Sequence, residues 1–99
     1  MTTTFRLTMA QLNPTVGDLA GNAAKARKAW DAAKDAGADM VALPEMFIAG
    51  YSTQDLVMKP VFHQAAEAAI EALAAECADG PTIGIGGPYF TDDRLYNAY

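Results

Sequence analysis

The sequence predicts an α/β fold in which short apolar strands alternate with amphipathic helices. Two segments, 18–36 and 60–77, carry apolar residues at spacings of three and four, which places them on one helical face. Short apolar runs lie before, between and after these segments, and turn residues separate them. The expected order is β-α-β-loop-α-β-β, and the first strand–helix–strand unit is expected to be a right-handed crossover between parallel strands.

The first strand is expected over residues 5–12, with both faces partly covered, because apolar and Thr residues are mixed there. Asp18 is the expected N-cap of the first helix, with Asn22 as the alternative. The helix is expected to run to about Ala36, because Gly37 suits the left-handed conformation that follows a helix.

The second strand is predicted at Met40–Leu43, a continuous apolar run typical of a buried parallel strand. It ends at Pro44, which cannot donate a ladder hydrogen bond. A long loop is expected over 44–58, with a short helical turn near Asp55. Pro60 is well suited to the first position of the second helix.

The C-terminal part is expected to form strands. Residues 79–81 stop the second helix, and 82–87 form a third buried strand. Residues 89–91 continue extended, 92–94 turn, and 95–99 begin a returning strand. That last strand reaches the end of the sequence without a stop signal, which predicts that the sequence is cut inside an element.

Composition indicates a folded chain with few large core residues. The 99 residues form one domain or part of one. Ala supplies 21 residues, whereas Leu, Ile, Val and Phe together number 19. The net charge of −5 is too modest for a disordered chain. Collagen-like, low-complexity and disulfide-scaffold classes are excluded, and a complete enclosed catalytic core is not expected.

Charge and hydropathy argue against nucleic acids and membranes as partners. Seven basic residues stand against twelve acidic ones, and Lys25, Arg27 and Lys28 form the densest basic group, so no nucleic-acid partner is expected. The sequence has neither a secretory signal nor the roughly 18 apolar residues of a membrane span. The single Cys77 fits a reducing compartment. These features predict a soluble cytoplasmic protein with no membrane partner.

Glu45 is the strongest candidate for chemistry. It is the only charged residue within Val41–Tyr51 and follows a buried strand, where open α/β sheets place their ligand sites. Its apolar neighbours Met46, Phe47 and Ile48 are expected to bury the carboxyl group and disfavour its charged form, as a general base requires. The alternative is a loop glutamate whose carboxylate reaches water.

Other polar candidates are expected to be structural, and no metal site is predicted. Cys77 is near a helix C-terminus, which disfavours a thiolate, so a packing role is expected. His63 is expected to be exposed on the first turn of its helix, and Glu67 and Glu71 to lie on a solvated face. The glycines of 84–87 precede no helix, so they favour close packing over phosphate binding.

Three stretches resemble the nitrilase, or carbon–nitrogen hydrolase, superfamily. Ala10–Asp18, with Asn22 after it, looks like the end of that family's first strand and the following loop. Leu43–Tyr51 looks like its catalytic-glutamate motif, and Leu95–Ala98 like the strand after its first glycine-rich core strand. The resemblance implies part of an α-β-β-α sandwich. Residues 1–99 would be the incomplete N-terminal part of a carbon–nitrogen hydrolase (glutaminase) domain.

Within the superfamily, 13–18 and 50–56 are most similar to the glutaminase domain of glutamine-dependent NAD synthetases, although prolines often stand there in place of Ser52 and Thr53. The resemblance implies that a Cys thiolate attacks the side-chain amide of glutamine and forms a thioester. Ammonia leaves, and water releases glutamate. The ammonia would serve an ATP-dependent domain of the same chain, which amidates nicotinic acid adenine dinucleotide.

The resemblance also implies residue roles. Glu45 would be the catalytic general base, and Tyr51 would line the acyl pocket as a substrate-binding residue. The family's catalytic Lys and Cys have no match, since Lys59 and Cys77 stand elsewhere in the pattern. The chain is therefore expected to be inactive alone and to hold no cofactor. ATP and Mg²⁺ are expected for the missing synthetase domain, and a homo-oligomer for the full-length enzyme.

Two alternatives remain open. One is another nitrilase-type amidase without a synthetase domain; an ATP-pyrophosphatase-type loop in a C-terminal extension would exclude it. The other is a complete, non-catalytic α/β binding module, which predicts cooperative unfolding of a monomer. A fragment predicts exposed sheet edges and an uncovered apolar face instead.

Overall fold

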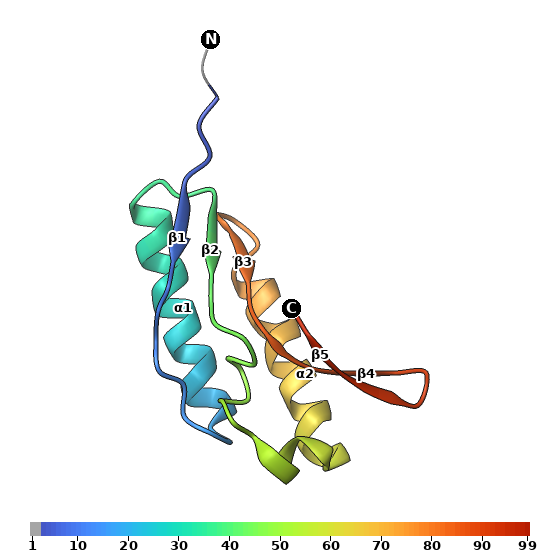
Figure 1. The fold of residues 1–99 in the computed structure, drawn as a ribbon. Helices are drawn as coiled ribbons and strands as arrows, with labels where there is room; N and C mark the ends of the chain where they lie inside the picture. Colours follow the sequence, from blue (N-terminus) through green and yellow to red (C-terminus); the bar gives the residue numbers. More distant parts are fainter. Residues whose placement is uncertain (1–2) are drawn as a thin grey trace.

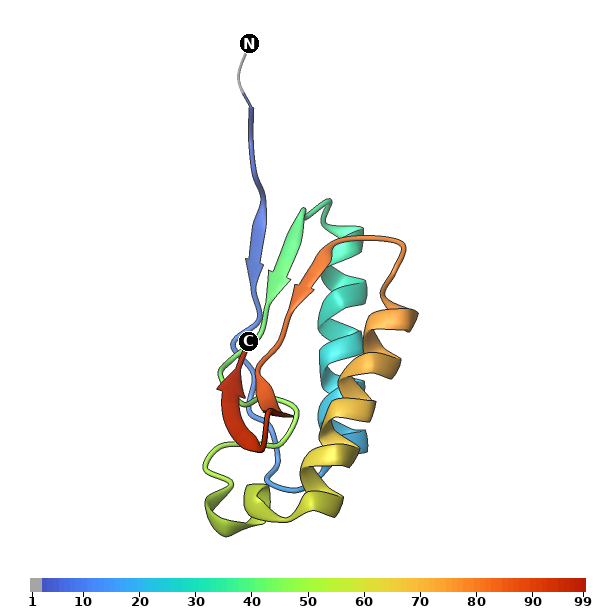
Figure 2. The ribbon, with the colours of Figure 1, turned by 90° about the vertical axis from the view of Figure 1, so that its right-hand side faces the viewer.

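The computed structural model describes residues 3–99 and places two helices on one face of a parallel sheet, with a hairpin at the C-terminal end (Figures 1 and 2). The predicted alternation of strands and helices is confirmed, and the loop turn near Asp55 is a 3-10 helix, but the predicted third strand over 82–87 is shorter, and three strands rather than two follow the second helix. The elements are β1 (Leu7–Met9), α1 (Leu19–Asp35), β2 (Met40–Ala42), η1 (Gln54–Met58), α2 (Pro60–Glu76), β3 (Thr82–Gly84), β4 (Gly87–Thr91) and β5 (Arg94–Ala98).

The sheet has the strand order β1-β2-β3, and both strand pairs are parallel. Thr8, Val41 and Ile83 are in register across it, and Val41 is fully buried beneath the helices. Strands β4 and β5 form a separate antiparallel pair. The α/β class is therefore confirmed, with one sheet and one helix layer of the expected sandwich present in residues 3–99.

Helix α1 begins and ends where its sequence predicts. The Asp18 side chain accepts a hydrogen bond from the Gly21 amide at 2.9 Å, so Asp18 is the N-cap. The backbone of Gly37 is left-handed, with φ of 74°. The expected cap and stop residues are therefore correct.

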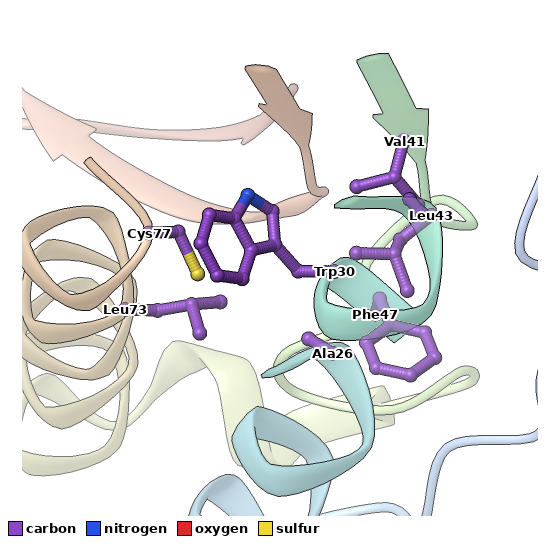
Figure 3. Close-up of a cluster of buried hydrophobic side chains, with 8 residues drawn as sticks. Ala26, Trp30, Val41, Leu43, Phe47, Leu73 and Cys77 are labelled. Atoms are coloured by element: carbon purple, nitrogen blue, oxygen red, sulfur yellow. The ribbon is translucent and has the colours of Figure 1, made fainter. Parts of the chain in front are cut away.

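The core lies between the two helices and the sheet (Figure 3). Trp30 extends from α1 toward Leu73 of α2 and the C-cap residue Cys77, and its indole N–H donates to the Pro81 carbonyl at 2.8 Å. Cys77 is buried, as predicted, and burial raises the pKa of its thiol above the ordinary value of 9.0. The buried cluster consists of Ala26, Trp30, Ala33, Val41, Leu43, Phe47, Leu73 and Cys77.

The prediction that His63 is exposed is wrong. Its side chain is buried, and its ring stacks on Phe90 of β4 with 5.1 Å between ring centroids. Glu67 is also only partly exposed, and its carboxylate accepts a hydrogen bond from the Phe90 amide at 3.4 Å. Of the predicted solvated pair, only Glu71 is exposed. The cause is the hairpin, which covers α2 from a distant part of the sequence.

The expectation of a first strand over residues 5–12 with both faces partly covered is also wrong. Strand β1 has only three residues and lies at the sheet edge, with Leu7 50% and Met9 79% exposed. These two side chains lie in the rows with Met40 and Ala42, opposite the face that the helices cover. Among residues 3–99, this face is an apolar surface without a covering layer.

No helix within residues 3–99 is both long enough and apolar enough to cross a membrane.

Candidate active site

Glu45 lies at the carboxyl edge of the parallel sheet, in the loop that follows β2. The loop around it is fixed at both ends, because the Leu43 amide donates to the Gly84 carbonyl at 2.8 Å and the Ile48 amide to the Gly86 carbonyl at 3.2 Å. Carboxyl ends of parallel strands are where α/β proteins place their ligand sites. The predicted position of Glu45 is therefore confirmed.

The expected burial of Glu45 is wrong for the described residues. Met46, Phe47 and Ile48 are buried, but they pack into the core while the Glu45 side chain is exposed. Met46 belongs to the cluster with Ala66, and Phe47 to the cluster around Trp30. The apolar neighbours thus anchor the loop and leave its carboxylate free to meet a reactant.

The backbone beside Glu45 takes a conformation that few residues adopt. Met46 has a φ of 53°, in the left-handed region, and non-glycine residues in that region often occur at functional sites. A Cβ on Gly86 would lie 2.4 Å from the Met46 backbone nitrogen, so a side chain there would displace the loop. The predicted use of these glycines for close packing is confirmed.

Asn22 joins the two segments that carry the family resemblance. Its buried side chain accepts from the Thr15 amide at 2.8 Å and donates to the carbonyls of Thr15 and Ile48 at 2.8 and 3.0 Å. A Cβ on Gly50 would lie 2.6 Å from Val16 Cα, so the two backbones touch there. The loop after β1 therefore supports the loop that holds Glu45.

Two side chains of the C-terminal segment bind the same loop. The Asn97 amide donates from Nδ2 to Glu45 Oε1 at 2.5 Å, and the Tyr99 hydroxyl donates to the Leu43 carbonyl at 3.0 Å. Sequence reasoning missed both contacts. The available signal was the spacing of two, which places Asn97 and Tyr99 on one side of an extended chain.

The structure does not join the second candidate, Tyr51, to Glu45. Tyr51 is 69% exposed and follows Gly50 at the far end of the loop. A hollow of 360 Å³ opens instead at the carboxyl ends of β1 and β2, beside Glu45 in sequence. Its lining residues are Met9, Ala10, Gln11, Ala42, Leu43 and Pro44.

The residues that the structure describes hold an accessible carboxylate at Glu45, with neither cysteine nor lysine hydrogen-bonded to it. Cys77, the single cysteine, is buried in the core, and Lys59 is the N-cap of α2. Neither residue hydrogen-bonds to Glu45. Within residues 3–99, no group of three or more His, Cys, Asp or Glu side chains could hold a metal ion. What the geometry provides is a held, accessible carboxylate that can accept a proton.

The relatives found by comparison with known proteins include several glutamine-dependent NAD(+) synthetases. An amidase from Nesterenkonia sp. shares the fold, with a TM-score of 0.72 and 21% identity over 86% of this chain and 32% of that one. The chain is 63% identical, over all 99 residues, to a glutamine-dependent NAD(+) synthetase of Rhodobacter capsulatus, and spans 18% of that protein. A crystal structure of such a synthetase from Cytophaga hutchinsonii matches with a TM-score of 0.88 and 30% identity, over 96% of this chain and 16% of that one.

Another relative is the glutamine-dependent NAD+ synthetase of Acinetobacter baumannii in complex with adenosine diphosphate. It matches with a TM-score of 0.79 and 25% identity, over 94% of this chain and 18% of that one. The family model for carbon-nitrogen hydrolases matches residues 6–99. The chain, with its glutamate at the carboxyl edge of a parallel sheet, therefore belongs to the carbon–nitrogen hydrolase family.

Proposed function

We propose that these residues are the first part of the glutaminase domain of a glutamine-dependent NAD synthetase. The observation that carries the proposal is 63% identity over the whole chain to a protein of that name, of which the chain spans 18%. The site supports it, because Glu45 stands accessible at the sheet edge, on a loop held from three sides. Glutamine is the proposed substrate.

In the proposed reaction, Glu45 is the general base. It takes the proton of a Cys thiol as the sulfur attacks the side-chain amide carbon of glutamine. Glu45 gives this proton to the departing nitrogen as the carbon–nitrogen bond breaks, so ammonia leaves, a thioester remains and the carboxylate is regenerated. Glu45 then takes a proton from the water that releases glutamate. The Cys and an oxyanion-stabilising Lys belong to chain beyond these residues, and Tyr51 lines the acyl pocket.

The ammonia then serves a synthetase domain of the same protein. There it amidates nicotinic acid adenine dinucleotide at the expense of ATP, with Mg²⁺ as the metal of that domain. The ADP complex of the Acinetobacter baumannii relative supports the nucleotide requirement. We assign no cofactor to residues 3–99 themselves. A homo-oligomer and a cytoplasmic location, where ATP is available, complete the proposal.

The variant Glu45→Gln tests this proposal in the full-length enzyme. It keeps the side-chain shape and removes the base, so glutamine-dependent NAD synthesis should fall about 100-fold or more. Synthesis from added ammonium chloride should stay within about twofold, because that route bypasses the glutaminase site. Both rates are measured from NAD formation.

Glu71→Gln is the matched control, because it removes an exposed carboxylate from α2. It should leave both rates unchanged. Equal loss of both rates in Glu45→Gln would assign that residue a structural role and contradict the proposal.

A further inference from the structure

The Glu45 carboxylate has one hydrogen-bond donor among residues 3–99, the side-chain amide of Asn97. The distance from Asn97 Nδ2 to Glu45 Oε1 is 2.5 Å, and the two residues are 52 positions apart in the sequence. A carboxylate can accept hydrogen bonds at both of its oxygens, and this contact occupies Oε1. This contact therefore orients the carboxylate and leaves Oε2 free to take a proton.

The strand that carries Asn97 is itself supported. In β5, Asn97 pairs with Pro88 of β4, and β4 packs on α2 through the stacked rings of Phe90 and His63. The Phe90 amide also donates to the Glu67 carboxylate of α2. The donor thus stands on a hairpin whose other strand is fixed to a helix, rather than on a free loop.

A second contact fixes the backbone at the start of the same loop. Two residues after Asn97, the Tyr99 hydroxyl donates to the Leu43 carbonyl at 3.0 Å. Figure 2 shows β5 returning to the loop that follows β2. One side of the C-terminal segment therefore binds both the Glu45 carboxylate and the backbone two residues before it.

We propose that Asn97 is a positioning residue for Glu45, which it holds with one carboxylate oxygen bound and the other directed at the reactants. The inference rests on the proposed function, because it concerns how the general base is oriented. Asn97 does not touch the substrate in this scheme. Its contribution is the N–H group, which an oxygen atom at the same place cannot supply.

Two variants of the full-length enzyme separate this role from simple packing. Asn97→Leu removes the polar group, and Asn97→Asp keeps the shape but replaces the donor with an acceptor that repels Glu45. In both, kcat for glutamine hydrolysis should fall about 10- to 100-fold while KM for glutamine stays within about twofold. The ammonia-dependent rate should not change.

The most informative measurement is which of Asn97→Asp and Asn97→Leu has the lower kcat. A structural role for an exposed residue predicts that Asn97→Asp is milder than Asn97→Leu, because it is isosteric and polar. A positioning role predicts that Asn97→Asp is at least as impaired. Asn97→Gln keeps the donor and should recover part of kcat. Gln64→Leu, which removes an exposed amide from α2, is the control and should leave kcat unchanged.

A double variant ties the effect to Glu45. In Glu45→Gln, adding Asn97→Leu should lower the residual rate by less than about threefold, because the group that Asn97 positions is already absent. Near wild-type kcat in Asn97→Asp, or equal loss of the ammonia-dependent rate, would overturn the inference. Retained glutamine turnover in Glu45→Gln would instead overturn the proposed function, so the two failures are distinguishable.

Discussion

Asn22 shows how one buried polar side chain can fix two loops. Its amide satisfies the Thr15 N–H and the carbonyls of Thr15 and Ile48, and its side chain is fully buried. Buried backbone groups without partners are costly, so this side chain is a condition for the loop conformation. Glu45 depends on it indirectly, because Ile48 anchors the same loop.

The variant Asn22→Leu should loosen both loops. It leaves the Thr15 amide and the Ile48 carbonyl without the partner that Asn22 provides, and each such group costs roughly 1–3 kcal/mol, whereas the Thr15 carbonyl keeps its hydrogen bond from the Asp18 amide. The Thr15 amide should exchange its hydrogen about 10-fold faster or more, measured by peptide-resolved hydrogen exchange of the full-length enzyme. Asn13→Leu, in the same loop and exposed, is the control. Unchanged protection at Thr15 would show that other contacts fix the loop.

Helices α1 and α2 pack with the sheet around a shared core, and Cys77 lies in that core at the end of α2. Cys77 ends α2 and packs with Trp30 of α1 and Leu73 (Figure 3). Burial is the main cause that raises the pKa of its thiol, while the Arg27 guanidinium acts in the opposite direction. The thiol is therefore a packing group rather than a nucleophile.

Alkylation should distinguish Cys77 from a reactive cysteine. In the native full-length enzyme at pH 8, iodoacetamide should leave the Cys77 peptide unmodified, whereas in urea it should modify that peptide fully. Because the pKa is raised in the folded state, the thiol favours folding below pH 9.0. That contribution is lost as the pH rises through the higher folded-state pKa. Rapid native alkylation would contradict a buried thiol.

For the whole molecule, the feature that matters is the sheet face opposite the helices. Leu7 and Met9 are exposed on it, although apolar side chains of strands normally lie against a second layer. In the proposed full-length enzyme, the rest of the glutaminase domain provides that second layer. The isolated 99-residue chain should therefore self-associate, and a sharp two-state melt of a monomer would favour a complete binding module instead.

The variant Met9→Glu should improve the isolated 99-residue chain but destabilise the full-length enzyme. In the isolated chain it should raise solubility, because the side chain is 79% exposed and the new charge interrupts the apolar face. In the full-length enzyme the same charge would be buried by the second layer and should lower the melting temperature. Ultracentrifugation and thermal unfolding measure the two effects. The same sign in both contexts would contradict the covering layer.

The sequence predicts most of the fold because its signals there are local. Asp18, Gly37 and Pro60 mark helix ends by their own chemistry, and each does so in the structure. The burial predicted for Glu45 and the exposure predicted for His63 are both wrong. Both depend on which distant element packs nearby, and a window of neighbouring residues does not contain that information.

The span between Glu45 and Asn97 also sets an order of events during synthesis. The two residues are 52 positions apart, so the carboxylate leaves the ribosome well before its donor. The strand–helix–strand unit around β2 can form from nearby residues, whereas this contact closes a long loop and forms late. The nascent chain thus carries Glu45 without its orienting bond until the hairpin has emerged.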